Sequence, residues 1–301
     1  MTGPIEDVRL RPWAAVLRVP TPGGAVYFKE ADDSLAHEAR LIEILARRRP
    51  ELVTDVVVSD ERGRMLMRDA GEALHAVLDR DLDLRYWEEA LPLYAELQIE
   101  AVREADELIA VGAFDRRAAI LPDVYERLVA QPAEGQTPEE YVELCRFTSE
   151  VERICAQLVD APIPATINND DLTGGSIFVR DRSYRFLDWG DACLSHPFFT
   201  LTVTQRIIEI RHGLPVRSAE IARARDAYLE PFTRFTARAE LEELVEPARR
   251  IGQICRVALR AENPFWDDPG DLAWAFRLLL DPEAWRRWNE VEQPPRQGPV
   301  S

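Results

Sequence analysis

The hydrophobic pattern of this 301-residue chain changes character once, at Asp69-Ala70-Gly71, and that change constrains the fold more than any other feature. Before it, four short β-rich runs surround one amphipathic segment, residues 34–49, whose apolar residues recur at helical spacing. The runs are residues 13–19, 25–30, 53–58 and 64–68. We therefore expect residues 1–69 to form a small N-terminal lobe, an antiparallel sheet with one helix.

After Gly71 the chain is mostly helical by the same criterion. Long amphipathic segments, separated by Pro or Gly, cover residues 85–111, 138–159, 199–211, 218–236, 239–262 and 270–280. Residues 163–200 interrupt them with short alternating runs that are dense in Asn, Asp and Gly. We expect residues 70–301 to form a larger helical lobe, so the predicted fold class is α+β with two lobes.

Lysine occurs once in the chain. Of its 37 Lys and Arg residues, only Lys29 is lysine. A coding bias toward arginine explains the others but not the exception, because a compact ammonium does something that a planar guanidinium does not. Lys29 lies near the end of a predicted strand, and Glu38 lies in the first turn of the predicted helix that follows. The alternative is a lysine retained by chance.

Two carboxylates flank the apolar runs inside residues 163–200. Asp171 precedes one run and Asp188 follows the next, with a tight turn at residues 180–183 between the runs. Such a hairpin brings both aspartates to the same end. Converging carboxylates suit a base that activates a hydroxyl and a ligand for Mg²⁺. The alternative is that both are turn formers beside glycine.

The order of these features resembles the aminoglycoside phosphotransferase and choline kinase branch of the protein-kinase-like fold, along nearly the whole chain. That family has a His-Gly-Asp loop with an Asn five residues after the Asp, and a second loop of Ile-Asp-Trp with an acid two positions beyond the Trp. Asn169-Asp170-Asp171 matches the first loop, and the segment Leu187-Asp188-Trp189-Gly190-Asp191 matches the second. The second match is the more specific.

The resemblance implies a role for each matching residue. Lys29 corresponds to the lysine that grips the α and β phosphates of ATP, and Glu38 to the acid that holds it. Asp171 corresponds to the base that takes the acceptor's proton, and Asp188 to the ligand of Mg²⁺. The segment from Met67 through Ala70 corresponds to the hinge that faces adenine, with Met67 and Asp69 as its binding residues. The implied reaction is Mg²⁺-dependent transfer of the ATP γ-phosphate to a hydroxyl of a small molecule.

Two residues of the first loop depart from the family pattern. Asn169 stands where the family has His, and Ser176 where it has the metal-binding Asn. The resemblance makes Ser176 a metal ligand that needs closer approach or a bridging water. One reading is a working kinase. A second is a pseudokinase that binds a nucleotide or a protein, and a third is a helical interaction protein whose hairpin is only structural. With no GxGxxG near the start, residues 10–14 are expected to cover the phosphates.

The composition of the chain limits the classes of molecule that we expect it to bind. With 54 Asp and Glu against 37 Lys and Arg, the net charge of −17 argues against nucleic acid and anionic membranes as partners. No apolar run is long enough to span a bilayer, and the start lacks the pattern of an export signal. The four cysteines form no CxxC pair, which is typical of reduced thiols in a cytoplasmic protein. The oligomeric state stays open.

Two acidic stretches bear on the acceptor. Residues 79–107 carry many acids, which would suit a cationic or sugar-like acceptor if they lined the cleft. The alternative is a solvated helix face. Residues 263–268 combine aromatic and acidic side chains, which could stack and pair with a sugar-like amine, or could simply form a turn before a helix.

Overall fold

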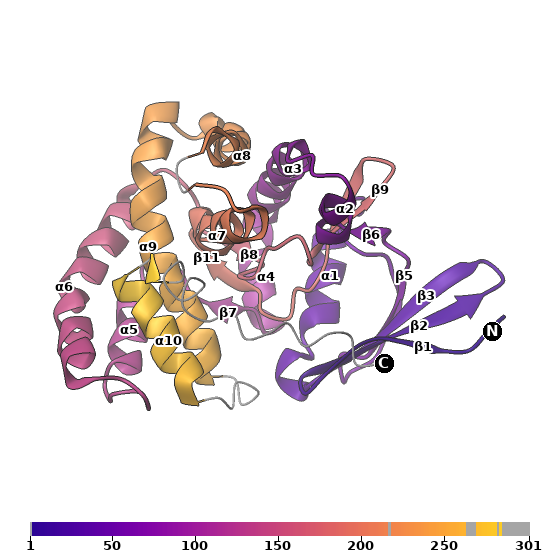
Figure 1. The fold of residues 1–301 in the computed structure, drawn as a ribbon, viewed down its shortest axis with the longest axis horizontal. Helices are drawn as coiled ribbons and strands as arrows, with labels where there is room; N and C mark the ends of the chain where they lie inside the picture. The colour runs from indigo at the N-terminus through magenta and orange to yellow at the C-terminus, as the bar shows by residue number, and fades with distance from the viewer. Residues whose placement is uncertain (1, 216–217, 263–268, 282, 285–301) are drawn as a thin grey trace.

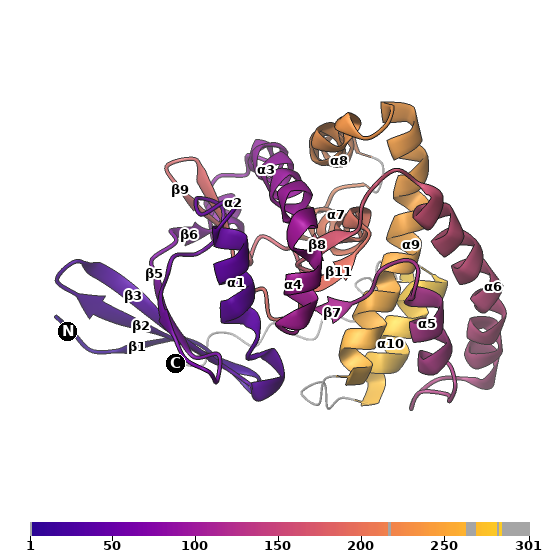
Figure 2. The ribbon, with the colours of Figure 1, turned by 180° about the vertical axis from the view of Figure 1, so that it is seen from behind.

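The computed structural model describes residues 2–215, 218–262, 269–281 and 283–284. An antiparallel sheet lies at one end of the molecule and a helical assembly fills the other, as Figures 1 and 2 show from opposite sides. The predicted α+β class with two lobes is confirmed. Among the described helices, none combines the length and the apolar character that crossing a bilayer requires.

The N-terminal sheet has five strands in the order β1-β2-β3-β5-β4, each antiparallel to its neighbours. The strands are β1 (Glu6–Arg11), β2 (Ala14–Thr21), β3 (Gly24–Ala31), β4 (Val56–Ser59) and β5 (Met65–Arg68). Lys29 lies on the central strand β3, between Val16 of β2 and Met65 of β5. This position buries its stem, so that only 8% of the residue is exposed.

Strand β1 corrects the expectation that residues 10–14 form a loop. The chain enters as a strand and turns at Pro12-Trp13 into β2, so a hairpin takes the place of that loop. Val8 and Leu10 alternate with arginines, but both are more than half exposed. A strand without a buried face gives little hydrophobic signal in a sequence.

The helix after β3 begins later than predicted. The side chain of Asp32 accepts a hydrogen bond from the backbone of Ser34 and caps a short 3₁₀ turn, Asp33–Leu35. The helix proper, α1 (Glu38–Ala46), therefore starts at Glu38 and not at Ser34. Its buried face, which includes Leu41 and Leu45, packs into the core.

A short linker joins the lobes. Gly71 has a φ of +109°, and a Cβ at this position would clash with the carbonyl oxygen of Val179. Only glycine lets the backbone pass so close in this conformation. The next residues form β6 (Glu72–Ala73), which pairs with the hairpin strand that contains Val179. The linker is thereby fixed against the helical lobe.

The helical lobe follows the predicted ranges closely. Its helices are α2 (Leu74–Arg80), α3 (Arg85–Ala101), α4 (Ala105–Ala110), α5 (Leu121–Leu128), α6 (Pro138–Asp160), α7 (Thr200–His212), α8 (Ala219–Leu229), α9 (Arg238–Glu262) and α10 (Pro269–Leu280). The start of α6 is fixed by a capping box between Thr137 and Glu140. The sequence pattern does not predict α2 and α5.

The segment 163–200 forms the predicted hairpin. Strands β9 (Ile177–Arg180) and β10 (Ser183–Phe186) pair through a turn in which Asp181 and Arg182 both have positive φ. Two further strands, β8 (Thr166–Asn168) and β11 (Cys193–Ser195), pair with each other, and β11 also pairs with β7 (Phe114–Asp115). The loop that carries Asp171 runs from β8 to β9 and the loop that carries Asp188 runs from β10 to β11, so both loops connect the same two strand pairs.

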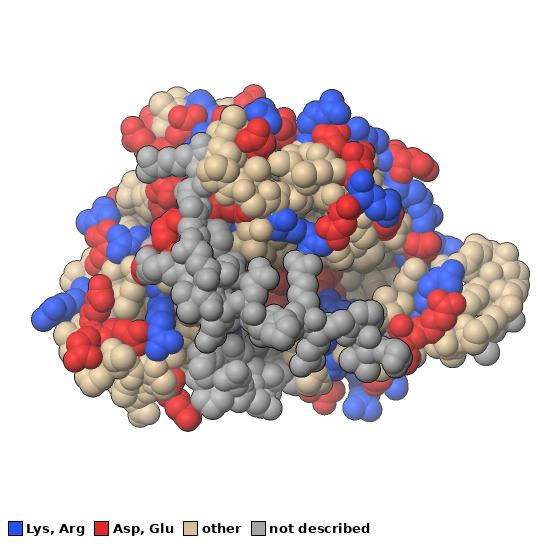
Figure 3. Space-filling view, in the orientation of Figure 1, with Lys and Arg blue, Asp and Glu red and all other residues tan. Residues whose placement is uncertain are grey.

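Acidic and basic side chains are interspersed over the face drawn in Figure 3. Several acids of the stretch 79–107 form ion pairs with arginines of other elements: Asp79 with Arg211, Glu88 with Arg223, Glu89 with Arg182, Glu96 with Arg234 and Glu100 with Arg49. This pairing supports the solvated-face reading of residues 79–107. Residues 263–268 lie outside the described residues.

The cysteines are all free thiols. Cys155, Cys193 and Cys255 are buried, and Cys145 is exposed.

Candidate active site

A cavity of about 260 Å³ lies between the sheet and the helical lobe. Its wall combines strands of the N-terminal sheet, the linker and both loops of the segment 163–200. Every predicted site residue except Ser176 lines it: Lys29, Glu38, Met67, Asp69, Asp171 and Asp188. Trp13 and Ala14, at the turn that replaces the expected phosphate-covering loop, line it as well.

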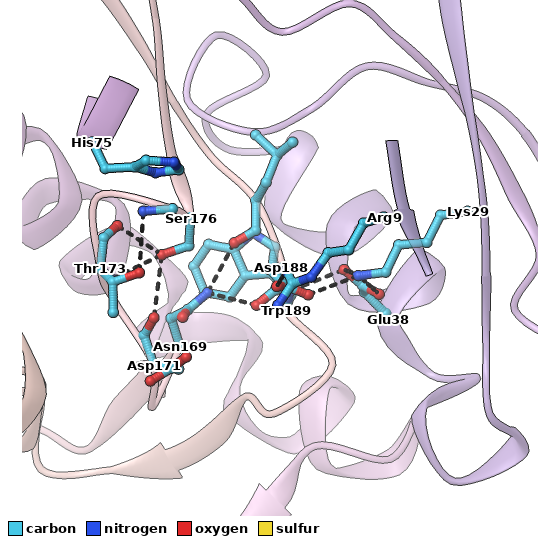
Figure 4. A network of polar contacts seen from close by, with 12 residues as sticks. Arg9, Lys29, Glu38, His75, Asn169, Asp171, Thr173, Ser176, Asp188 and Trp189 are labelled. Carbon is cyan, nitrogen blue, oxygen red and sulfur yellow. Dashed lines mark hydrogen bonds and ion pairs between the residues drawn. The ribbon is translucent and has the colours of Figure 1, made fainter. Parts of the chain in front are cut away.

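Lys29 lies between two carboxylates. Its Nζ donates to Glu38 Oε1 at 2.8 Å and to Asp188 Oδ1 at 2.8 Å (Figure 4). Burial disfavours the charged form of the lysine, but Asp188 and Glu38 outweigh burial and raise its pKa. The ammonium is therefore a permanent charge at the centre of the cleft.

Glu38 links three elements. Besides Lys29 of β3, its Oε1 accepts a hydrogen bond from the backbone N–H of Trp189 at 3.0 Å. The first residue of α1 thus holds both the lysine and the backbone directly after Asp188. Trp189 is completely buried and stacks on Tyr94, so this anchor belongs to the core.

Asp188 sits on a backbone with a φ of +64°, a conformation that asparagine and aspartate adopt more readily than other side chains. The side chain is 52% exposed, and its Oδ2 lies 3.7 Å from Nη1 of Arg9. The charge of Lys29 lowers the pKa of Asp188. An ionised, accessible carboxylate of this kind is a suitable ligand for a hard cation.

Asn169, which the resemblance aligns with a His, has a defined structural task. Its side-chain amide donates to the carbonyl oxygens of Leu187 at 3.1 Å and of Asp188 at 2.9 Å. Its backbone N–H donates to the hydroxyl of Tyr94 at 2.8 Å. The residue therefore ties the loop of Asp171 to the loop of Asp188.

Ser176 does not line the cavity. Its hydroxyl accepts a hydrogen bond from the backbone N–H of Thr173 at 2.9 Å, and it lies 3.0 and 3.2 Å from the carbonyl oxygens of Thr173 and Asp171 (Figure 4). The residue is 4% exposed. Ser176 thus shapes the loop that carries Asp171, and its hydroxyl is bonded to the loop backbone outside the lining of the cavity.

Asp171 projects into the cavity with a side chain that is 49% exposed. Its Oδ1 lies 3.3 Å from Nη2 of Arg256, a residue of α9. The same guanidinium contacts Asp170, donating to its backbone oxygen at 3.2 Å and to Oδ2 at 3.4 Å. Burial opposes the charge of Arg256, but the surrounding aspartates raise its pKa. The guanidinium of Arg256 thus holds the Asp171 carboxylate in place.

Asp170 occupies the position of the family glycine and keeps a positive φ of 61°. Its carboxyl is 6% exposed, contacts Arg256 and does not line the cavity, and burial raises its pKa. Of the two neighbouring aspartates, Asp171 is the one that a bound molecule can reach.

Two residues of this site were missed by the sequence analysis, Arg9 and Arg256. Arg9 lies on the unpredicted strand β1. Arg256 interrupts the apolar run from Ile254 to Leu259 on a buried helix face, and a charge at such a position was a usable signal.

The carboxyl of Asp191 should make stability depend on pH. Burial raises its pKa to about 7; nearby carboxylates add to the shift and Arg256 opposes it. In the unfolded chain this group ionises near pH 4. Because the Asp191 carboxyl keeps its proton to a higher pH in the folded state than in the unfolded chain, its ionisation lowers the stability of the fold as pH rises between these values.

We therefore expect Asp191→Asn to raise the Tm relative to the unmodified chain at pH 8 more than at pH 5, measured in EDTA. Asp106→Asn, at an exposed position of α4, serves as the control. An equal shift at both pH values would contradict the assignment.

The comparisons place this fold among small-molecule kinases. No protein-family model matches the sequence, and no curated protein matches it. The solved structure of APH(2″)-IIIa with GDP and kanamycin superposes with a TM-score of 0.63 at 14% identity, covering 93% of both chains. A choline/ethanolamine kinase family protein from Mesorhizobium loti superposes with a TM-score of 0.60 at 16% identity, and the match covers 96% of this chain and 92% of that protein. Amicoumacin kinase with AMP-PNP and Ca²⁺ superposes with a TM-score of 0.59 at 10% identity, and the match covers 92% of this chain and 88% of that protein.

The chain therefore has the fold of these kinases, as its resemblance to the family implies.

Proposed function

We propose that this protein is a small-molecule kinase that transfers the γ-phosphate of ATP to a hydroxyl of its acceptor with the help of Mg²⁺. One observation carries the proposal: a single cleft brings together a buried lysine, its glutamate partner and two reachable aspartates, Asp171 and Asp188. Neighbours of the same fold bind GDP or AMP-PNP. Phosphoryl transfer needs little beyond positioning and charge neutralisation, which such a set supplies.

In this proposal the N-terminal lobe binds the nucleotide. Lys29 donates to the α and β phosphates, and Glu38 keeps it in place. The backbone from Met67 through Asp69 faces the adenine, at the edge of the same cavity. Asp188 would hold Mg²⁺, which would supply neutralisation of the phosphate charge. The oxygen donor, its exposure and its ionised state all fit this ion.

Asp171 receives the acceptor. Its carboxylate orients the hydroxyl and takes its proton as the oxygen attacks phosphorus. Arg256 positions this carboxylate through the contact at 3.3 Å. A carboxylate that is held in place and open to the cavity has the geometry that a general base requires.

The test is ADP formation from ATP in the presence of Mg²⁺, with and without candidate hydroxyl acceptors. We expect slow ADP release alone, faster release with an acceptor, and none in EDTA. A protein that binds ATP but releases no ADP with any acceptor would instead be the catalytically impaired alternative, a pseudokinase.

Ser176 is the observation that favours this alternative, because its hydroxyl is used by the loop. We expect Ser176→Asn to lower the Tm and not to raise turnover, since a larger side chain must enter a site that is 4% exposed. A gain in turnover or in Mg²⁺ affinity would show that Ser176 limits metal binding, and the loop would then be a decayed one.

A further inference from the structure

A second pocket, of about 690 Å³, lies in the helical lobe, mainly between α6, α7, α8 and α9. Helix α7 runs beside α9 in both ribbon views (Figures 1 and 2). Although the chain has a net charge of −17, five arginines and four glutamates line this pocket. The arginines are Arg153, Arg206, Arg225, Arg249 and Arg250.

Arg206 is the least compensated of these cations. Its Nη2 donates to Gln253 Oε1 at 2.9 Å, and no carboxylate of the described residues lies within ion-pair distance. Burial, together with three arginines of α9, lowers its pKa to about 10, whereas Glu209 acts in the opposite direction to a smaller extent. Arg206 is partly buried, and cations that are withdrawn from water are ordinarily paired with an anion.

Arg249 and Arg250 support the same interpretation of the pocket. The Nε atoms of both are buried and have no hydrogen-bond partner among the described residues. Their acidic partners lie at the rim: Glu246, bound to Arg249, is 76% exposed, and Glu150 lies 3.7 Å from Arg250. A molecule in the pocket cannot reach these closed Nε atoms, but the two side chains are 22% and 41% exposed, so their outer N–H groups can donate to an oxyanion.

The pocket begins close to the proposed base. Arg249, Gln253 and Arg256 follow one another at helical spacing on one face of α9. Gln253 binds Arg206 in the pocket, and Arg256 binds Asp171 in the cleft. Three residues of a helix rise by roughly 4.5 Å along its axis, and the charge of Arg256 acts on Arg206, so the wall of the pocket and the wall of the cleft are neighbours on α9.

We propose that the pocket around Arg206 and Arg249 binds an anionic group, a carboxylate or a phosphate, of the phosphoryl acceptor. The acceptor is then an acidic hydroxy compound, not a cationic amine. This assignment rests on the proposed kinase function. The acids of α3 line neither pocket and are paired with arginines of other elements, so they provide no site for a cationic group.

The first test uses inorganic phosphate as the probe. We expect calorimetry to show saturable phosphate binding to the full chain, and thermal unfolding to show a higher Tm with phosphate. Arg206→Gln should weaken this binding by about tenfold or more and should raise the Tm without phosphate, because it removes a desolvated charge. Arg223→Gln, at a half-exposed position of α8 that faces Glu88, is the matched control and should bind as the unmodified chain does.

Absence of saturable binding to the unmodified chain would overturn the proposal. Equal binding by Arg206→Gln would overturn it too.

The second test compares acceptors by ADP formation. Hydroxy acids and sugar phosphates should accelerate it, and Arg206→Gln should raise their KM far more than the KM for ATP. Faster turnover with kanamycin or ethanolamine than with any acidic acceptor would refute the anionic assignment. The two proposals fail differently: phosphate binding through Arg206 in a chain that does not bind ATP refutes the kinase, whereas turnover indifferent to Arg206 refutes the pocket.

Discussion

Replacing Asp171 with asparagine is expected to lower phosphoryl transfer by about 10²- to 10⁴-fold, with little change in the affinity for ATP. The amide has nearly the shape of the carboxylate but cannot take the acceptor's proton. Asp171 faces the cavity without touching Lys29 or Glu38, so nucleotide binding should survive. Steady-state ADP formation at saturating acceptor, together with calorimetric titration of ATP, measures both quantities.

The matched control is the neighbouring Asp170→Asn. This carboxyl contacts Arg256 and does not line the cavity, so its loss should change the rate by less than about tenfold. If Asp170→Asn abolished transfer and Asp171→Asn did not, the two aspartates would have been assigned the wrong way round.

Replacing Lys29 with arginine is expected to reduce kcat/KM for ATP by about 10²-fold or more, even though the positive charge is kept. The lysine is 8% exposed and its ammonium lies 2.8 Å from both Glu38 and Asp188. A planar guanidinium needs more room and different geometry to reach these two carboxylates and a phosphate at once. The kinetics are measured with circular dichroism as a check on folding.

Arg18→Lys is the reverse change at an exposed ion pair of β2, and it should leave kinetics unchanged. A Lys29→Arg variant with the ATP affinity and kinetics of the unmodified chain would remove Lys29 from the phosphate site.

Two parts of the site could be predicted because the contacts inside each part are local in sequence, whereas the contact between Lys29 and Asp188 spans 159 positions and depends on the fold. Lys29 and Glu38 are separated by one turn and one short 3₁₀ segment. The aspartates at positions 171 and 188 flank a single hairpin, so alternating apolar residues and one turn were enough to bring them together. Because Lys29 is the single lysine of the chain, the sequence also indicated β3 as part of the site.

The rest depended on contacts that are distant in sequence. Arg256 lies 86 positions after Asp170, and the periodicity of a helix shows which face is buried without showing what it packs against. The same holds for the acids of α3: their number predicted a negative surface, but the arginines that pair with them come from other elements. Strand β1 escaped prediction because both of its faces are exposed.

The roles of single loop residues also needed coordinates. From the sequence, Ser176 was a short replacement for a metal-binding Asn. In the structure its hydroxyl is bound by the loop backbone, while Asn169 reaches across to Leu187 and Asp188. Hydrogen bonds of this kind depend on side-chain direction, which a motif does not specify.

The most direct test of the central claim, a nucleotide site built on Lys29 and Asp188, is calorimetric titration of ATP into the unmodified chain and into Asp188→Asn, each with Mg²⁺ and with EDTA. We predict binding in the micromolar range to the unmodified chain with Mg²⁺, and a large loss of affinity when either Mg²⁺ or the carboxylate is removed. Binding that is indifferent to both would contradict the metal site, and no binding under any condition would contradict the kinase itself and leave a helical interaction protein.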